Sequence, residues 1–548
     1  MLEQQAPSPA AQPLGTQQAA LGTSSNPNNP NNPNNPGNPN NPGNPANPGA
    51  ARRVALNAFN PFAAQLFTKL LMMGYSMVQY RLFANDQAAL DGYILAGVVF
   101  SYTSTISEWG MGTLVPRDVA RSRGTGEDAR VASTLFGRSL VLRLLISLAL
   151  FLPVAALVAV YTSFFDLRAD GAIAVAVLTL SLLPGAFSGS VTALLYAYER
   201  MSLPAGVGIA TSVLNVVLGV SALALGLGVV GLAVSALATT LVAALVFLRV
   251  LRRNFPGVAV RPGGLSIGPG EVGSLLSAGW PLMLNALLVG LFFRVDTFII
   301  KAAPGGEGDL TRYNAAYSFL NFVLLISPAV TLALFPRMSR HAVSDRTRLN
   351  AEYAFALKIM LGMSVPIVAG TVWLAPLLIA VLTLDAPNYL PDSAVALRIL
   401  IFFLPLSFIN GLTQYVLIAV DRQRLITRAF AATVLFNLLA NLLLIPLLGI
   451  YGAALTTILS EVVIMVPFLW WTRLEVGDVP LFSISLKPAL AGAVTGLLVW
   501  LLWPVQDTWR SGLGAFALYV GVAVAIPVVY LAVLTFLRPF TGPEKQLL

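Results

Sequence analysis

Long apolar stretches recur along the chain from Asn57 onward, and short polar segments separate them. Each stretch is close to the roughly 20 residues that an α-helix needs to cross a bilayer. We therefore predict an all-α polytopic membrane protein with about fourteen transmembrane helices. The predicted spans are approximately 57–80, 90–113, 134–160, 170–192, 204–226, 228–249, 272–300, 313–335, 354–382, 394–419, 425–447, 449–471, 484–503 and 513–537.

Composition supports a membrane protein and excludes several classes of chemistry. Of the 548 residues, 56% are hydrophobic and 10% are charged, whereas a soluble domain carries roughly 25% charged residues. The lack of cysteine excludes disulfides, thiolate metal sites and cysteine nucleophiles. The only histidine, His341, has no partner for a histidine-based metal or catalytic site. The sequence contains no Walker-type phosphate loop, which excludes ATP hydrolysis by that route.

The distribution of Lys and Arg predicts the orientation in the membrane. With the N-terminus in the cytoplasm, 22 of the 33 Lys and Arg residues fall in inside segments and 5 fall in outside loops. A wrong helix count would invert the later loops and remove this contrast. We therefore expect a multi-pass protein of the bacterial inner membrane with both termini in the cytoplasm. A basic cytoplasmic face then explains the net charge of +9, so no nucleic acid is expected as a partner.

Residues 1–50 differ in composition from the rest of the chain. The stretch from Asn26 to Gly49 repeats Asn-Pro, Asn-Asn-Pro and Gly-Asn-Pro with almost no apolar residue. Such a segment buries too little surface to offset the entropy of ordering, so we expect a disordered cytoplasmic tail. It has no charged region followed by an apolar region, which argues against a signal peptide.

The chain also resembles itself at an offset of 220 to 222 residues. The matched pairs run in order through both halves: Pro61 with Pro281, Tyr93 with Tyr313, Pro116-Arg117 with Pro336-Arg337, Leu183-Pro184 with Leu404-Pro405, Glu199-Arg200 with Asp421-Arg422, Asn215 with Asn437, and Gly228-x-x-Gly231 with Gly449-x-x-Gly452. Because six helices return the chain to the side where it started, this series predicts two six-helix lobes related by a parallel repeat. Such a repeat places a substrate site between the lobes.

This repeat divides the chain into four regions. Residues 1–50 form the tail, residues 51–260 form an N-lobe with helices 1–6, and residues 261–475 form a C-lobe with helices 7–12. Residues 476–548 add two further helices and a short cytoplasmic end.

Charged side chains inside the predicted spans are candidate functional residues, since a charge at the bilayer centre costs about 2.5–3.5 kcal/mol. Arg294 and Asp296 lie near the middle of the seventh span, and two residues apart on a helix they point nearly opposite ways. Lys69 lies midway along the first span, and Arg143 lies towards the cytoplasmic end of the third. These four residues are the candidates for a substrate cavity.

Arg398, Glu108 and Glu461 are further charged residues within the predicted spans. Arg398 lies near the outer end of the tenth span and is expected to extend outward to water. The carboxylates of Glu108 and Glu461 are expected to be buried, where each either pairs with a cation or carries a proton. With Asp296 they are the candidates for coupling to an H⁺ or Na⁺ gradient; no cofactor and no bound metal are expected.

Charged residues at the predicted cytoplasmic helix ends allow two interpretations. They form an intracellular gate whose ion pairs break as the lobes rock, or they only end helices and signal topology. The sequence favours the second interpretation. The residues concerned are Arg117, Glu199, Arg200, Arg337, Asp421 and Arg422.

Cations inside a membrane suit an anionic substrate. A guanidinium group binds phosphate oxygens in a bidentate manner and loses less on desolvation than an ammonium group. A pyrophosphate-linked sugar offers such a group beside a polar head, while its lipid tail stays in the bilayer. The candidate cations therefore suggest a lipid-linked phosphorylated sugar as the substrate class.

Several motifs resemble the polysaccharide-biosynthesis flippases of the multidrug/oligosaccharidyl-lipid/polysaccharide superfamily. They are Gln65-Leu66…Lys69-Leu70-Leu71, Gly110-Met-Gly-Thr-Leu-Val-Pro-Arg117-Asp118, Tyr198-Glu199-Arg200 and Arg294-Val-Asp296-Thr297. The resemblance covers about residues 55–480, and its motifs are loose.

This resemblance implies a two-lobed, MATE-like fold and a function in alternating access. The implied substrate is an undecaprenyl-pyrophosphate-linked oligosaccharide repeat unit, moved from the cytoplasmic to the outer leaflet for O-antigen, capsule or exopolysaccharide synthesis. It implies a polysaccharide polymerase and glycosyltransferases as partners. Only the cavity cations Lys69, Arg143 and Arg294 carry over as substrate residues.

Four alternatives remain open. A lipid II flippase typically has an Arg-Asp pair in its first helix, whereas Lys69 has no adjacent acid. A drug/cation antiporter needs buried acids, for which Asp296 is a candidate, but the spans are biased towards cations. A membrane glycosyltransferase or polymerase needs a catalytic acid or base on a large outside loop, and the predicted outside loops are short, so we expect no enzyme. A scaffold without transport would use the tail as a tether.

Overall fold

The structure is a computed structural model that describes residues 48–122, 128–255, 268–304, 306–506 and 508–537. By its contacts the chain divides into two units, Met1–Ala63 and Ala64–Leu548. Residues 1–47 of the predicted tail lie outside the described residues, and the first helix begins at Pro48. The arrangement below concerns the second unit.

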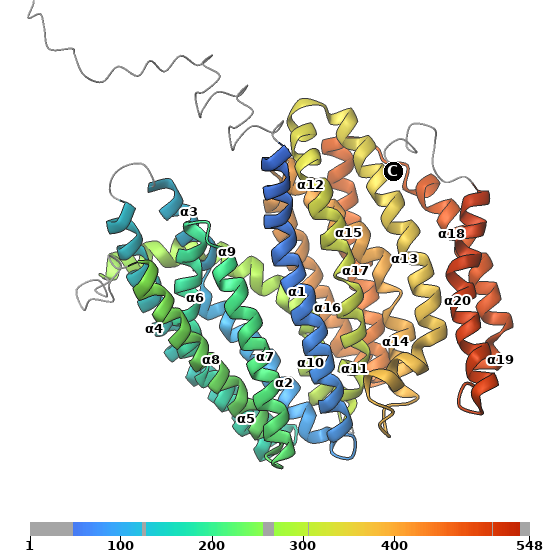
Figure 1. Ribbon diagram of the computed structural model, residues 1–548, viewed down its shortest axis with the longest axis horizontal. Helices are drawn as coiled ribbons and strands as arrows, with labels where there is room; N and C mark the ends of the chain where they lie inside the picture. Colours follow the sequence, from blue (N-terminus) through green and yellow to red (C-terminus); the bar gives the residue numbers. More distant parts are fainter. Residues whose placement is uncertain (1–47, 123–127, 256–267, 305, 507, 538–548) are drawn as a thin grey trace, which may run out of the picture. The chain divides into compact units, whose positions relative to one another are not determined.

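Every regular element in these described ranges is a helix, as the sequence predicts (Figure 1). The helices are α1 (Pro48–Leu82), α2 (Gln87–Glu108), α3 (Met111–Ser122), α4 (Asp128–Phe164), α5 (Ala169–Leu180), α6 (Leu182–Ala197), α7 (Ser202–Ala224), α8 (Gly228–Asn254), α9 (Pro269–Arg294), α10 (Asp296–Ala302), α11 (Asp309–Val323), α12 (Ile326–Ser344), α13 (Arg346–Leu382), α14 (Asp392–Leu400), α15 (Phe403–Ala419), α16 (Gln423–Leu448), α17 (Ile450–Val476), α18 (Leu481–Leu501), α19 (Trp503–Gln506) and α20 (Leu513–Phe536).

Within the described residues, eleven helical segments are long and apolar enough to cross a membrane, with α5–α6 and α14–α15 each counted as one. The other three predicted spans coincide with α1, with α2–α3 and with α11–α12. The all-α membrane fold is therefore confirmed, while the count of fourteen crossings stays a prediction. We call the end that bears the turns after α1, α10 and α13 the outer end, because the predicted topology places these turns outside.

Equivalent helices make equivalent contacts in the two halves of the chain. In the first half α2 packs on α5, α5 on α8, and α7 on α8, while α3 and α4 both pack on α6. In the second half α11 packs on α14, α14 on α17, and α16 on α17, while α12 and α13 both pack on α15. The sequence repeat therefore corresponds to a repeat of the same six-helix packing.

The backbone repeats its irregularities as well. The α2–α3 and α11–α12 pairs break in the middle, and so do the α5–α6 and α14–α15 pairs. Glu199 and Asp421, which the sequence repeat matches, have φ angles of 58° and 60°. Gly228 and Gly449, which begin the next matched turn, both have φ of 57°. Left-handed angles at both members of a pair show that the two halves turn in the same way.

The seventh predicted span, 272–300, is not one straight helix but breaks at Val295 between α9 and α10. Helix α9 contacts α2 and α3 as well as α16. The indole nitrogen Nε1 of Trp109 donates to the carbonyl of Leu276 at 3.0 Å. A Cβ atom on Gly110 would lie 2.8 Å from the carbonyl oxygen of Gly279, so the two backbones approach too closely for any larger residue. Helix α9 thus contacts both predicted lobes.

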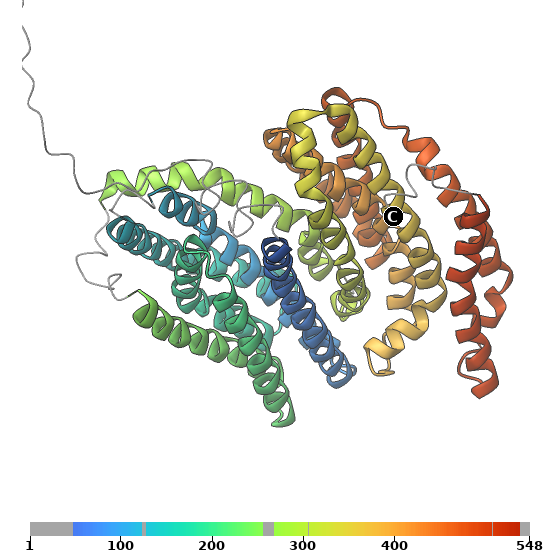
Figure 2. The same ribbon diagram turned by 45° about the horizontal axis from the view of Figure 1, so that its top comes forward.

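The two C-terminal helices α18 and α20 pack on each other and on α13, at the red end of the chain in Figures 1 and 2. Trp373 of α13 donates to the carbonyl of Tyr519 at 3.1 Å, and the Tyr519 hydroxyl donates back to the carbonyl of Trp373 at 2.9 Å. Arg398, which was expected to extend outward to water, instead donates to Gln506 at 2.7 Å and stacks on the Trp503 ring. These contacts fix the C-terminal pair to the C-lobe.

Candidate functional site

Arg294 ends α9 and is half-buried beside α11. Its NH1 atom donates to Oδ1 of Asn314 at 3.0 Å, and its guanidinium carbon lies 4.6 Å from the centre of the Tyr317 ring. A guanidinium group held by stacking and by one hydrogen bond retains further N–H donors for a ligand.

A tyrosine of the first lobe completes this group. The Asn314 amide donates to the Tyr80 hydroxyl at 2.9 Å, and that hydroxyl lies 2.9 Å from Oγ of Ser318. Tyr80 belongs to α1, whereas Asn314 and Ser318 belong to α11. We call Arg294, Asn314, Tyr317, Ser318 and Tyr80 the Arg294 network; it joins side chains of both lobes.

Aromatic residues of the N-lobe lie against the same region of α9 and α10. The Tyr102 hydroxyl donates to the carbonyl of Gly290 at 3.2 Å, and its ring stacks on Phe298 with centres 5.8 Å apart. The Tyr161 hydroxyl donates to the carbonyl of Phe298 at 3.0 Å. Tyr102 and Tyr161 therefore contact the C-lobe at Gly290 and Phe298, which lie on either side of Arg294 in the sequence.

Asp296 begins α10 and is buried in the C-lobe. Its side chain is buried, accepts from the Tyr313 hydroxyl at 2.7 Å, and also accepts from the Thr297 amide at 2.8 Å. The Tyr313 hydroxyl lies 3.4 Å from Oγ1 of Thr457. Among the described contacts no ion pair joins Asp296 to Arg294. The two residues therefore bind different partners.

Glu461 is buried in the same lobe, with 3% of its surface exposed, as the sequence led us to expect. The amide of Asn410 donates to the Glu461 carboxylate and also to its backbone carbonyl at 2.9 Å. The described residues supply no basic partner for Glu461. A buried carboxylate without a cation is costly in its charged form, so this group favours carrying a proton or a bound cation.

Arg143 and Glu108 form a pair within the N-lobe. The Arg143 side chain is buried, with 6% of its surface exposed, and its NH2 atom lies 3.8 Å from Oε1 of Glu108. Gly189 makes room for it, because a Cβ there would lie 2.2 Å from NH1. The prediction that Glu108 is buried is wrong: its side chain is 50% exposed because it ends α2 at the break before Trp109.

Lys69 is exposed on α1 and has no hydrogen-bond or ion-pair partner in the described part of the chain. The structure does not bring it into contact with the Arg294 network.

The candidate gate residues make their described contacts within their own half of the chain. Arg117 pairs with Asp118 at 2.7 Å, and Arg422 pairs with Glu475 at 2.6 Å. Arg200 donates to the Asn254 side chain and lies over the Phe255 ring. The matched residues Glu199 and Asp421 form the left-handed turns described above, and the side chain of Arg337 lies outside the described residues.

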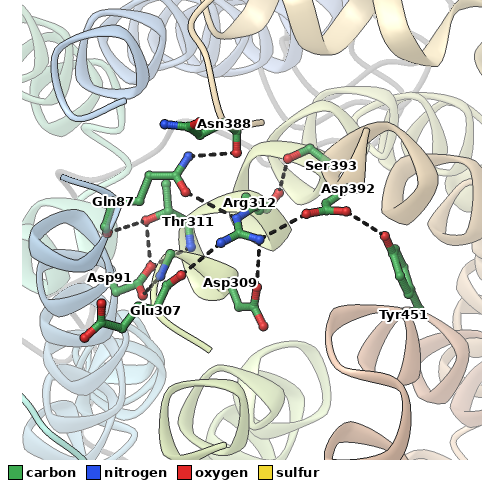
Figure 3. A network of polar contacts seen from close by, with 11 residues as sticks. Gln87, Asp91, Glu307, Asp309, Thr311, Arg312, Asn388, Asp392, Ser393 and Tyr451 are labelled. Atoms are coloured by element: carbon green, nitrogen blue, oxygen red, sulfur yellow. Dashed lines mark hydrogen bonds and ion pairs between the residues drawn. The ribbon is translucent and has the colours of Figure 1, made fainter. Parts of the chain in front are cut away.

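One further group of polar contacts crosses between the halves at the outer end, as Figure 3 shows. Arg312 is at their centre: it donates to Oε1 of Gln87 at 3.2 Å and pairs with Asp309 at 3.2 Å and with Asp392 at 3.0 Å. We call this group the outer network; its members are Gln87, Asp91, Glu307, Gly308, Asp309, Thr311, Arg312, Asn388, Asp392, Ser393 and Tyr451.

Asp91 is the fully buried member of this network that comes from α2. Its carboxylate accepts from the Gly308 amide at 2.8 Å, and from both the amide and the hydroxyl of Thr311 at 2.7 Å each. Asp91 and Thr311 are 220 residues apart, which is the offset of the repeat. Equivalent positions that touch lie on the pseudo-two-fold axis, so the axis leaves the outer end at this contact.

Sequence reasoning identified Arg294 and Asp296 but not their partners or the outer network. Asn314, Tyr80 and Ser318 are ordinary polar residues near span ends, and no local pattern distinguishes them. The contact between Asp91 and Thr311 could have been predicted from the sequence, because the separation of the two residues equals the offset of the repeat.

Comparisons with known proteins identify the fold. The chain is similar over 86% of its length to the lipid II flippase MurJ in an inward closed conformation, with a TM-score of 0.66, 14% identity and 98% of that chain covered. It is similar over 74% of its length to an inward-facing multidrug resistance MATE family transporter of the MOP superfamily, with a TM-score of 0.60, 19% identity and 94% of that chain covered. At these identities the likeness shows the fold alone.

A third structure and the curated proteins add to this comparison. A MOP superfamily transporter from Pyrococcus furiosus matches with a TM-score of 0.54 and 18% identity, over 76% of this chain and 95% of that one. No curated protein sequence matches this chain.

Two families match the sequence itself. The family called MatE matches residues 281–462. The family described as polysaccharide biosynthesis protein matches residues 54–342, which is more than half of the 548 residues. The chain therefore belongs to the polysaccharide biosynthesis protein family, with the multi-pass membrane fold of the MOP superfamily.

Proposed function

We propose that this protein is a flippase that moves an undecaprenyl-pyrophosphate-linked oligosaccharide from the cytoplasmic to the outer leaflet of the bacterial inner membrane. The observation that carries the proposal is the Arg294 network: a half-buried guanidinium group stands where side chains of both lobes meet. Its free N–H donors suit the paired phosphates of such a lipid. The protein itself performs no chemical step.

Lys69 supports a water-filled chamber on the substrate path. It is exposed although it lies midway along the first predicted span. An ammonium group that faced lipid at this depth would cost several kcal/mol, whereas one that faces water costs little. We therefore assign Lys69 to the chamber as a second cation, and Arg143, with its half-exposed partner Glu108, to the wall of the N-lobe.

The position of the cross-lobe contacts supports alternating access. The outer network joins α2 to the start of α11 and of α14, whereas the described contacts of Arg117, Arg200 and Arg422 stay within one lobe. At the inner end the lobes also meet along α9, where Trp109 donates to the carbonyl of Leu276 and Arg138 pairs with Glu271. Opening of these inner contacts while the outer network stays closed would admit substrate from the cytoplasm. The six candidate gate residues would pair across the lobes in the opposite conformation.

The function is tested with purified protein in liposomes that carry a fluorescent pyrophosphate-linked oligosaccharide on a polyprenyl lipid. An enzyme added outside the vesicles modifies only the lipid in the outer leaflet. We expect the fraction of lipid that this enzyme reaches to change with time, at a rate that depends on the protein. A lack of movement together with export of a cationic dye would contradict the proposal. Cells depleted of the protein should accumulate the lipid-linked unit in the inner leaflet, because the glycosyltransferases still make the unit but it does not reach the polymerase.

Buried carboxylates favour a second candidate, a drug/cation antiporter. Asp296 and Glu461 are both buried in the C-lobe, where Asp296 accepts from the Tyr313 hydroxyl and Glu461 accepts from the Asn410 amide. In the flippase proposal the same two groups take up H⁺ or Na⁺ and couple its gradient to the movement of the lobes.

Glu461→Gln tests this coupling. We expect an imposed ion gradient to accelerate wild-type flipping about tenfold and the mutant much less. The neutral amide takes up and releases no proton, and it binds Na⁺ more weakly than a carboxylate does. The rate without a gradient should stay within about twofold. The measurement is flipping in liposomes with and without H⁺ or Na⁺ gradients, and Asp170→Asn is the control because Asp170 pairs with Arg168 at the outer end, apart from the proposed coupling site. Equal stimulation of mutant and wild type would exclude Glu461 from coupling.

A further inference from the structure

A cavity of about 480 Å³ lies at the inner end of α17, apart from the Arg294 network and the outer network. This volume is within the range of about 300–1,000 Å³ that is usual for small-molecule sites. Its walls come from α13, the end of α17 and the start of α18.

The cavity has an apolar side and a polar edge. Val466, Pro467 and Leu481 line the apolar side. At the edge, Arg473 pairs with Asp478 at 3.3 Å, and the two side chains are 64% and 73% exposed. Such an exposed pair contributes little to stability, so both charges remain available to a ligand. The edge therefore offers one positive and one negative group side by side.

Aromatic residues place this edge at the depth of lipid headgroups. Trp470 lines the cavity and is 62% exposed, and it is followed by Trp471 and then by Arg473. Tryptophan with a neighbouring basic residue is typical of the membrane–water interface. The apolar side of the cavity thus faces acyl chains while its edge faces headgroups.

The edge is also held in place by the rest of the protein. The Asn350 amide of α13 donates to the carbonyls of Val476 at 3.3 Å and of Asp478 at 3.2 Å. Between them Gly477 has φ of 100°, an angle that larger residues rarely adopt. Thr472 lines the cavity with a buried hydroxyl that has no partner among the described residues. A fixed edge and an unpartnered hydroxyl indicate a binding site.

We propose that this cavity binds one phospholipid whose headgroup carries both a phosphate and an ammonium group, as that of phosphatidylethanolamine does. The phosphate binds the Arg473 guanidinium in a charge-assisted contact, and the ammonium binds Asp478 and the face of Trp470. One acyl chain lies along Val466 and Leu481. Asp478 repels a headgroup of net negative charge, which sets the preference for a zwitterionic lipid. This site does not depend on what the protein transports.

The experiment uses the full chain in nanodiscs made from equal amounts of phosphatidylethanolamine and phosphatidylglycerol. Native mass spectrometry then measures which lipid stays bound. We expect wild-type protein to retain phosphatidylethanolamine at least about fivefold over phosphatidylglycerol, as two charge-assisted contacts require. Asp478→Asn should reverse the preference, because the edge then carries only the positive charge of Arg473, and Arg473→Gln should weaken the retention of both lipids.

Two further variants keep the test decisive. Leu481→Ser changes no charge and removes apolar surface from the side where the acyl chain lies, so it should lower the retention of both lipids equally. That result supports the site even if a charge variant folds poorly. Arg253→Gln, in the exposed basic run at the end of α8, should leave the retention of phosphatidylethanolamine unchanged. Equal retention of the two lipids by wild type, or an unchanged preference in Asp478→Asn, would overturn the proposal.

Discussion

Arg294→Gln should reduce lipid flipping by at least about 100-fold while the protein stays folded. Its guanidinium group is held between Asn314 and the Tyr317 ring, and a pair of charge-assisted hydrogen bonds to phosphate is worth about 3 kcal/mol, or a factor of about 100. Glutamine keeps a polar side chain that still bonds Asn314, so the packing around α9 changes little. The measurement is the flipping rate in liposomes, with thermal stability in detergent measured alongside it.

Two variants separate the role of charge from that of shape. Arg294→Lys keeps the charge but loses the planar fork, and we expect a loss of about tenfold. Lys69→Gln, which removes a charge that contacts no other described side chain, should also cost about tenfold, since a solvated charge contributes only about 1–2 kcal/mol. If flipping is unchanged in both Arg294→Gln and Lys69→Gln, the phosphate-binding chamber is wrong.

Asp91→Ala should open the outer end and shift the conformational equilibrium by a factor on the order of 100. The mutation leaves the Gly308 and Thr311 amides without their acceptor, and a buried donor without a partner costs about 1–3 kcal/mol. A shift of this size leaves the inward-receiving conformation scarcely populated, so flipping should fall by at least about tenfold. The wild-type chain has no cysteine, so spin labels at Asn85→Cys and Glu307→Cys measure the outer distance directly.

Asp170→Ala is the matched control for this prediction. Asp170 is also an outer carboxylate, but it pairs with Arg168 at 3.2 Å within the same lobe. Its removal should change neither the distance distribution nor the flipping rate by more than about twofold. A distance distribution in Asp91→Ala that matches wild type would show that the outer network does not hold the lobes together.

The fold could be predicted from the sequence because membrane solvation acts on whole segments. A span of about 20 apolar residues must be helical in lipid, whatever its neighbours are. The repeat is visible in the sequence through matched residues such as Glu199 and Asp421. What the apolar pattern could not show is where a helix breaks, as at Val295. Such a break depends on packing against other helices.

The candidate site was predicted less completely, for a physical reason. The cost of a buried charge points to Arg294, Asp296 and Glu461 without any knowledge of their partners. Partners such as Asn314 or Tyr80 are neutral, and burying them costs less free energy than burying a charge. They therefore do not stand out within an apolar stretch of the sequence. The prediction for Glu108 was wrong for a different reason. A charge within an apolar stretch was expected to be buried, but the helix ends at Glu108 and leaves its side chain half exposed.

The contact between Asp91 and Thr311 has a consequence for how such a protein arose. In a dimer of two identical chains, a residue on the symmetry axis meets its own copy. Two aspartates would repel each other there, and two threonines would leave the Gly308 amide without a carboxylate. Joining the halves into one polypeptide allowed the copies to diverge into an acceptor and a donor. The closure of the outer end is thus a form of asymmetry that a dimer of two identical chains could not have.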